Sequence, residues 1–137
     1  MHEFALAEGV AVTAVEAARR EGLRRITRLA VSVGQLQQFE PTLFAEVLRE
    51  IMPRTHAELD GVEVDLRTVP AALRCRACGR EFGLSECANG LDAKQSEAIH
   101  FVPELVHAYG RCPGCGSPDF EIVRGRGVWL DQVEGTT

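Results

Sequence analysis

Two short cysteine motifs offer the clearest chemistry in this chain: CRAC at residues 75–78 and CPGC at residues 112–115. In a C-x-x-C turn both thiolates converge on one ion, and the glycine that follows each motif, Gly79 or Gly116, lets the chain fold back. Backbone N–H groups can then bond the sulfurs. The two motifs therefore predict a closed four-thiolate shell, which suits structural zinc. Its ligands would be Cys75, Cys78, Cys112 and Cys115.

A redox dithiol and a set of disulfides are the alternative interpretations of these cysteines. A redox C-x-x-C needs no second motif, and five cysteines in a chain with no visible secretory signal fit metal binding better than a disulfide framework. We expect the odd one, Cys87, to be a free thiol, with a place in the zinc shell as the alternative. The gap of residues 79–111 is longer than in common zinc ribbons, so it must be a folded insertion, with a short helix starting at Pro103.

The N-terminal sequence MHE offers a second and different metal site. The α-amine of Met1, the backbone nitrogen of His2 and the His2 imidazole can bind one metal ion in a plane. Ni(II) and Cu(II) favour such square-planar nitrogen donors. Three donors leave one corner for Glu3, for another histidine or for a ligand from a partner, which suits delivery of an ion rather than storage. Taken alone, a histidine at this position is more often an ordinary exposed side chain than a metal ligand.

Periodic apolar residues predict the elements that position these motifs. Segments with helical spacing are bounded by stop and start signals, such as Gly22 after the first and Pro41 at the start of the second. Other segments alternate apolar and polar residues, as half-buried strands do. We expect helices over 4–21 and 41–52 and strands over 26–33, 62–69, 120–123 and 127–134.

A shift in composition near Pro70 marks a domain boundary, because the segment that follows holds all the cysteines and many turn residues. The expected architecture is α+β: two helices packed on a roughly three-stranded sheet, with an inserted zinc-ribbon-like lobe. Residues 1–70 and 120–137 would form the α+β domain that carries the N-terminal metal site. Residues 71–119 would form the zinc-binding domain.

Composition and charge limit the classes of function. The 137 residues, of which 45% are hydrophobic, suffice for a packed core, while a net charge of −5 argues against a general nucleic-acid binder. No apolar run is long enough for a membrane span, and no secretory signal is visible, so we expect a cytoplasmic protein. The chain has no recognisable nucleophile–base pair, phosphate loop or pair of catalytic carboxylates. We therefore do not expect an enzyme.

The combination of motifs resembles the HypA/HybF family, the nickel chaperones of [NiFe]-hydrogenase maturation, over essentially the whole chain. MHEFALAE resembles the opening of that family and SVGQLQQFEPTLFAEVL its next segment, while CRACGREF and CPGCGSPDFEIVRGRGVWL resemble its zinc lobe and return strand. The long gap between the cysteine motifs looks like the archaeal branch. RTHAELDGVEV lacks the glycine pair usual in the corresponding turn, so we expect that loop to differ.

The resemblance implies Ni(II) at His2, assisted by the nitrogens of Met1 and by Glu3, and structural Zn(II) at the four cysteines. It implies binding and transfer of nickel rather than catalysis. The expected partners are a HypB-type nucleotide hydrolase and the hydrogenase large subunit, with no nucleic acid and no membrane span, and the resemblance leaves room for a homodimer.

The insertion supplies candidates for the open corner of the nickel site. We expect His100 to fill it, because His100 stands before the predicted short helix rather than on it. The zinc lobe would then have to lie over the N-terminus, which would couple the two metals. His107, on that helix, is expected to be a packed or surface side chain, and His56 to be solvated.

Two other classes of function compete with a nickel chaperone. One is a zinc-ribbon module in transcription or translation, which the net acidity and the lack of stacking aromatics between basic residues disfavour. The other is an enzyme that uses the N-terminal ion as a Lewis acid. A planar nitrogen-rich site with one open corner is poorly suited to hydrolysis, which needs an open tetrahedral or octahedral ion.

Overall fold

A computed structural model describes the chain over residues 2–37, 40–87, 90–102 and 105–137, and in these ranges groups of helices and groups of strands follow one another. None of the helices in these ranges combines the length and the apolar character that crossing a membrane requires. In chain order the elements are α1 (His2–Arg20), β1 (Arg25–Gly34), α2 (Pro41–Glu46), η1 (Val47–Ile51), η2 (Met52–Arg54), η3 (Ala57–Leu59), β2 (Glu63–Val69), β3 (Ala72–Cys75), β4 (Glu81–Gly83), α3 (Leu84–Cys87), α4 (Ala93–Phe101), α5 (Val106–Tyr109), β5 (Phe120–Arg124) and β6 (Val128–Thr136).

The chain divides into two compact units, each with its own three-stranded sheet and its own apolar core. Their sheets have the strand orders β2-β1-β6 and β4-β3-β5. The expected α+β class is confirmed, with helices packed on one sheet and a separate unit that carries the cysteines. The first unit comprises Met1–Val33, Phe39–Thr68 and Val128–Thr137, and the second comprises Gly34–Gln38 and Val69–Gly127.

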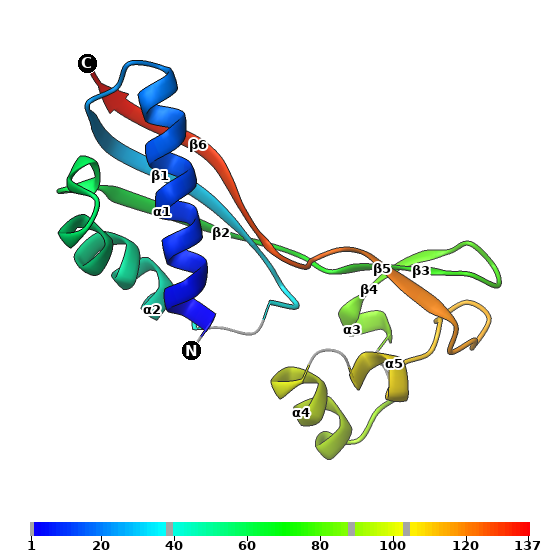
Figure 1. Cartoon of the computed structure of the whole chain (residues 1–137). Helices are drawn as coiled ribbons and strands as arrows, with labels where there is room; N and C mark the ends of the chain where they lie inside the picture. Colours follow the sequence, from blue (N-terminus) through cyan, green and yellow to red (C-terminus); the bar gives the residue numbers. More distant parts are fainter. Residues whose placement is uncertain (1, 38–39, 88–89, 103–104) are drawn as a thin grey trace. The chain divides into compact units, whose positions relative to one another are not determined.

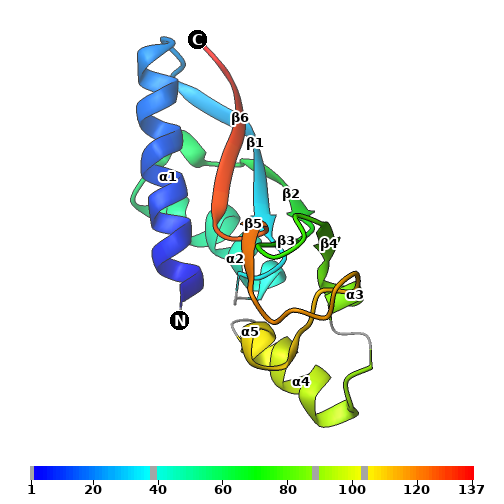
Figure 2. The same cartoon turned by 90° about the vertical axis from the view of Figure 1, so that its right-hand side faces the viewer.

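In the first unit, α1 and α2 share one apolar core with the sheet β2-β1-β6 (Figure 1). Small residues of α1 face this core, and Ala7, Ala11 and Ala14 are fully buried, which lets the helix lie close to the strands. Helix α1 runs beside β6 in both views (Figure 2). Arg19 and Arg20 occupy its last turn, where positive charge is favoured by the helix dipole.

A β-bulge corrects the phase of the apolar residues in β1. Ile26 and Leu29 are three residues apart, so a regular strand would point them to opposite faces, yet both are fully buried. The antiparallel pairing of β1 with β6 is interrupted between Ile26 and Arg28, where Thr27 is the extra residue. The bulge thereby turns both side chains towards the helices.

Helix α2 begins with a capped first turn. The Glu40 side chain accepts a hydrogen bond from the Thr42 N–H (3.0 Å), and Pro41 occupies the first helical position, where its missing N–H is harmless. The helix continues through the π-helical turn η1 and ends in the 3₁₀ turn η2, which contains Pro53. The predicted helix over 41–52 is therefore present, with its second half irregular.

The second unit contains a strand that the sequence assigns to the first domain. The sequence predicts that residues 120–137 return as one piece, but β5 pairs antiparallel with β3, with Cys75 opposite Phe120. The crossing into the first unit comes after Gly127. The physical reason is that strand pairing depends on a partner distant in sequence, which local alternation does not identify.

The insertion between the cysteine motifs contains a helix, α4, that the sequence analysis misses. Its first turn has a capping box, in which Asp92 accepts from the Gln95 N–H and the Gln95 side chain accepts from the Asp92 N–H. The pattern D-x-x-Q was visible in the sequence. The expected short helix is present as α5 (Val106–Tyr109), while its predicted start at Pro103 lies outside the described residues.

Two glutamine side chains join three segments at the base of the second unit. The Gln35 side-chain oxygen accepts from the Ala71 N–H (2.7 Å), and the Gln37 oxygen accepts from the Gly127 N–H (3.1 Å). Backbone bonds reinforce the junction, because the Leu36 N–H donates to the Gly125 carbonyl (2.8 Å). These amides satisfy backbone groups that the sheet leaves without a partner.

We predict that Phe44→Ala destabilises the protein by about 3–5 kcal/mol, because Phe44 is fully buried in the first core and its removal leaves a cavity. Leu43→Ala is the matched control. Leu43 is the neighbour of Phe44 on α2, but its side chain is 43% exposed, so this substitution should change stability by less than about 0.5 kcal/mol. Urea unfolding followed by circular dichroism measures both. Equal effects of the two substitutions would contradict this packing.

Candidate metal centres

The thiols of the two cysteine motifs meet in one cluster. The Sγ atoms of its four residues all lie within 4.8 Å of one another. The closest pairs cross from one motif to the other, Cys75 to Cys115 at 3.5 Å and Cys78 to Cys112 at 3.7 Å. Cys75 and Cys112 are buried, while the other two are exposed. The predicted set of four thiols is therefore brought together.

Each motif is a tight turn closed by its own backbone. The Gly79 N–H donates to the Cys75 carbonyl (2.9 Å), and the Gly116 N–H donates to the Cys112 carbonyl (2.8 Å). Both glycines have φ of +78°, a conformation that side chains disfavour. The second motif also aims the Gly114 N–H at the Cys112 sulfur (3.4 Å). The turns thus point sulfur atoms inward, as the sequence predicts.

Backbone N–H groups stabilise the thiolate form of one cysteine in each motif. The Cys115 N–H, helped by the Gly114 N–H, lowers the pKa of Cys112 to about 6 although burial opposes the change. The Cys78 N–H is the largest cause of a lowered pKa at Cys75. One ligand of each pair is therefore prepared for a metal ion before binding, because metals bind the thiolate.

The remaining strongly shifted thiol shows the opposite behaviour. A hydrogen bond from the Ser117 N–H lowers the pKa of Cys115, but the neighbouring Cys75 sulfur, burial and the other two thiols outweigh it and raise that pKa to about 11. Like charges held this close cannot all be ionised without a compensating cation. The cluster therefore has the chemistry of a cation site whose last protons leave when the ion enters.

The geometry of the cluster fits zinc. Zn(II) bound by four thiolates at about 2.3 Å requires sulfur atoms about 3.8 Å apart, close to the two cross-motif distances of 3.5 and 3.7 Å. A shell of thiolates alone leaves no open position for water or substrate, so the site suits a structural ion. The cysteines that would hold it are Cys75, Cys78, Cys112 and Cys115.

Cys87 lies outside this cluster, in the apolar core of the second unit. Its side chain is buried among core residues that include Val106 and Phe120. Burial is the largest cause of a raised pKa at Cys87, so its thiol is protonated and a weak ligand or nucleophile at neutral pH. This environment fits the free thiol that the sequence predicts.

The predicted N-terminal site is described only in part. Met1 lies outside the described residues, and so do the side chains of His2 and His100. The backbone places His2 at the start of α1 and His100 within α4, on a helix rather than in the connecting segment the sequence suggests. Glu3 is only 9% exposed, and its Oε1 accepts from the Glu40 N–H (3.0 Å). Glu3 therefore ties the first turn of α1 to the start of α2, a role that the sequence analysis misses.

The other two histidines have identifiable environments. His107 is exposed and stacks on the Phe120 ring, with centroids 5.1 Å apart and an interplanar angle of 19°. His56 is not fully solvated as expected, because its side chain is only 20% exposed and its Nε2 lies 3.5 Å from a Glu8 carboxylate oxygen. Both side chains thus have packing partners within their own units.

Comparison with known proteins gives matches along almost the whole chain. A family model described as "Hydrogenase/urease nickel incorporation, metallochaperone, hypA" matches residues 1–135. A protein named "Hydrogenase maturation factor HypA" from Thermococcus onnurineus (strain NA1) is 40% identical over 134 residues, covering 98% of this chain and 95% of that protein. Its namesake from Pyrococcus horikoshii is 41% identical over the same coverage. A further namesake from Ignicoccus hospitalis is 30% identical over 136 residues, covering 98% and 96%.

Two solved structures share the fold. The solution structure of the Ni metallochaperone HypA from Helicobacter pylori has a TM-score of 0.62 at 19% identity, covering 98% of this chain and 97% of that one. A second structure, titled "Solution structure of HypA protein", has a TM-score of 0.66 at 21% identity, covering 98% and 96%. At these identities the likeness concerns the fold alone.

Zinc binding at about pH 7 should release fewer than four protons, because Cys112, with a pKa of about 6, is already largely a thiolate. Calorimetric titration in buffers of different ionisation enthalpy counts the protons. At about pH 5 the count should rise and the affinity should fall, since Cys112 is then protonated. Release of all four protons at pH 7, with no change at pH 5, would contradict these thiol environments.

Proposed function

The chain belongs to the HypA family of hydrogenase-maturation metallochaperones, accessory proteins rather than enzymes, and from this premise we propose that it binds Ni(II) at its N-terminus and delivers the ion. The observation that carries the proposal is the family match, which begins at residue 1 and so includes the MHE sequence. The recipient is a [NiFe]-hydrogenase precursor. Nickel is the cargo in this proposal and not a resident cofactor.

The proposed nickel donors are the Met1 amine, the His2 backbone nitrogen and the His2 imidazole. Ni(II) binds a peptide nitrogen only after displacing its proton, which square-planar coordination favours. His2 is the first residue of α1, and the first N–H groups of a helix have no acceptor within the helix. The amide proton can therefore be lost without breaking a hydrogen bond of the helix.

Glu3 supports the same site electrostatically. The N-terminus of a helix carries partial positive charge and disfavours a cation, whereas an acidic residue in the first turn offsets it. Glu3 is that residue in α1, and its bond to the Glu40 N–H holds the first turn in place. Glu3 and His100 remain alternative candidates for the one open corner of the nickel plane, and His100 is the one we favour.

We assign Zn(II) to the four-thiol cluster as a structural ion. Thiolates are soft ligands and suit zinc, whereas the N-terminal nitrogens suit nickel, so the two sites differ in chemistry as well as in place. The unit with the sheet β2-β1-β6 would then supply the N-terminal nickel donors, and the unit with β4-β3-β5 would carry zinc. Zinc would hold together a unit whose apolar core is small.

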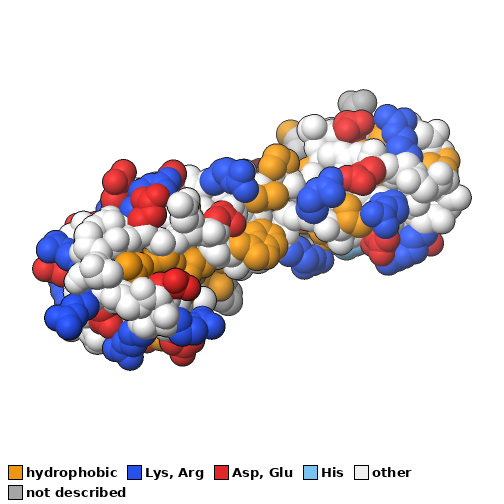
Figure 3. Space-filling model, turned by 90° about the horizontal axis from the view of Figure 1, so that it is seen from above, with side chains coloured by type: hydrophobic (Ala, Val, Ile, Leu, Met, Phe, Trp, Pro, Cys, Tyr) orange, Lys and Arg blue, Asp and Glu red, His pale blue; other side chains and the backbone are white. Residues whose placement is uncertain are grey.

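The proposed partners are a HypB-type nucleotide hydrolase and the hydrogenase large subunit, in the cytoplasm. We do not propose nucleic acid as a partner. The net charge is −5, and acidic and basic side chains are interspersed on the face drawn in Figure 3. A nucleic-acid surface would need a continuous basic area to replace counterions.

We predict that His2→Ala abolishes nickel binding and leaves one tightly held zinc per chain. The substitution removes the imidazole donor but touches none of the cysteines. Metal analysis followed by nickel titration measures both ions in the same preparation. Undiminished nickel affinity in this variant would refute the proposed nickel site, while absence of zinc from the unmodified protein would refute the zinc assignment.

We predict that His100→Ala weakens nickel binding by about tenfold or more and shifts the nickel absorption band, because one donor is lost. His107→Ala is the matched control: it removes a histidine from the same unit, one that stacks on Phe120 instead. An unchanged spectrum and affinity for His100→Ala would remove His100 from the site.

A further inference from the structure

Arg76 lies inside the first cysteine motif and bonds to the segment that follows the second motif. Its backbone N–H donates to the Asp119 carbonyl (3.0 Å), and its Nη1 donates to an Asp119 carboxylate oxygen (2.8 Å). Nη1 also approaches the Phe120 carbonyl (3.3 Å), and Nη2 lies 3.8 Å from a Glu121 carboxylate oxygen. One side chain thus contacts three successive residues.

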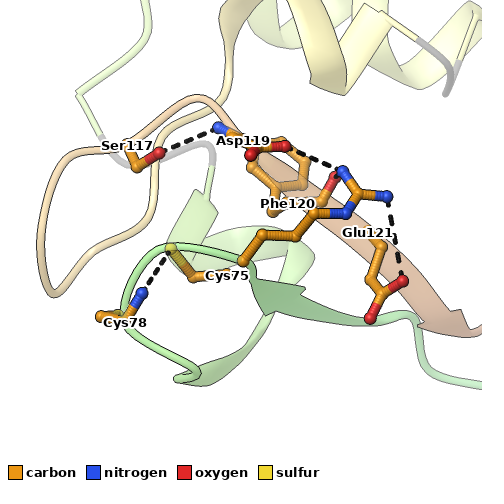
Figure 4. Close-up of polar contacts among 7 residues, drawn as sticks. Cys75, Cys78, Ser117, Asp119, Phe120 and Glu121 are labelled. Atoms are coloured by element: carbon orange, nitrogen blue, oxygen red, sulfur yellow. Dashed lines mark hydrogen bonds and ion pairs between the residues drawn. The ribbon is translucent and has the colours of Figure 1, made fainter.

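Hydrogen bonds link Asp119 to the second motif through Ser117. The Asp119 N–H donates to the Ser117 hydroxyl (3.1 Å; Figure 4), and the Ser117 carbonyl accepts from the Cys112 N–H (2.9 Å). A chain of hydrogen bonds therefore runs from Arg76, between two thiol residues of the first motif, to a thiol residue of the second. Backbone bonds that close each turn, by contrast, stay within one motif.

The bonds made by Arg76 lie just beyond the end of the β3–β5 pairing. The residue pairing of β3 with β5 ends at Cys75 opposite Phe120, so the rest of the first motif lies beyond the ladder. Along the chain, residues 79–111 separate the two motifs. A contact beyond the end of the ladder can therefore add to the strand pairing in keeping the two thiol pairs at the separation that one ion requires.

We propose that Arg76 is a positioning residue of the four-thiol site: by binding Asp119 it holds the two motifs together and slows the escape of the metal ion. It touches no metal itself. Its positive charge, fixed within the first motif, also offsets the net negative charge of a divalent ion bound by four thiolates. This inference rests on the zinc assignment proposed above.

The expected effect is modest but measurable. The Arg76 side chain is 54% exposed and that of Asp119 is 63% exposed, and exposed ion pairs contribute little because water screens them. We therefore expect Arg76→Ala to accelerate zinc release by roughly two- to fivefold.

The experiment follows zinc release from the full chain to an excess of a chromogenic chelator by stopped-flow absorbance. Arg124→Ala is the matched control, because Arg124 forms another exposed ion pair, with Glu81, in the same sheet but outside the motifs. Arg76→Lys keeps the positive charge and one donor group, so zinc release from this variant should be slower than from Arg76→Ala and faster than from the unmodified protein. If the contact with Asp119 is responsible, Asp119→Ala should match Arg76→Ala, and the double variant should release zinc no faster than either.

Three outcomes would overturn the role of Arg76 while zinc remains bound. They are release from Arg76→Ala at the unmodified rate, equal acceleration by Arg124→Ala, and single effects that multiply in the double variant. An unmodified protein that holds no zinc would instead overturn the zinc assignment and this inference with it. Far-UV circular dichroism of each zinc-loaded variant verifies the fold before release is started.

Discussion

Four sulfur atoms held within 4.8 Å of one another are the constraint on which the second unit depends. Their negative charges repel: although the Ser117 N–H lowers the pKa of Cys115, the neighbouring thiols and burial raise it overall, while the Cys115 and Gly114 N–H groups lower the pKa of Cys112. Pairing of β3 with β5 brings the two motifs to the same place, and their turns aim the sulfurs inward. A cation would satisfy this arrangement, so binding of the proposed zinc would contribute directly to the folding free energy of the unit.

In the first unit the constraint is the helix dipole, because the partial positive charge at the start of α1 disfavours a bound cation. At the same position the N–H groups have no acceptor within the helix, which suits planar nickel coordination through a peptide nitrogen. Glu3 connects these effects, because its buried carboxylate both offsets the dipole and fixes α1 against α2. Burial of Ala7 and Ala11 in the core anchors the first half of α1 to the rest of the unit.

Local chemistry explains which features the sequence predicted. The cysteine turns depend on residues within one motif, and α1 and the alternating strands depend on periodicity, so all were recognisable. The assignment of β5 failed because its partner β3 is distant in sequence. The bonds of Gln35 and Arg76 are likewise invisible to pattern analysis, since both need the folded chain to supply the acceptor or donor. Helix α4 was missed although its capping box was readable.

Ligand chemistry distinguishes the two proposed metal sites, with nitrogen donors for nickel and sulfur donors for zinc. X-ray absorption at the nickel and zinc edges, recorded on one sample loaded with both ions, tests this most directly. We expect a planar nickel environment of nitrogen and oxygen donors with imidazole scattering, beside zinc bound by sulfur alone. Sulfur neighbours at nickel, or zinc displaced from sulfur when nickel is added, would contradict it.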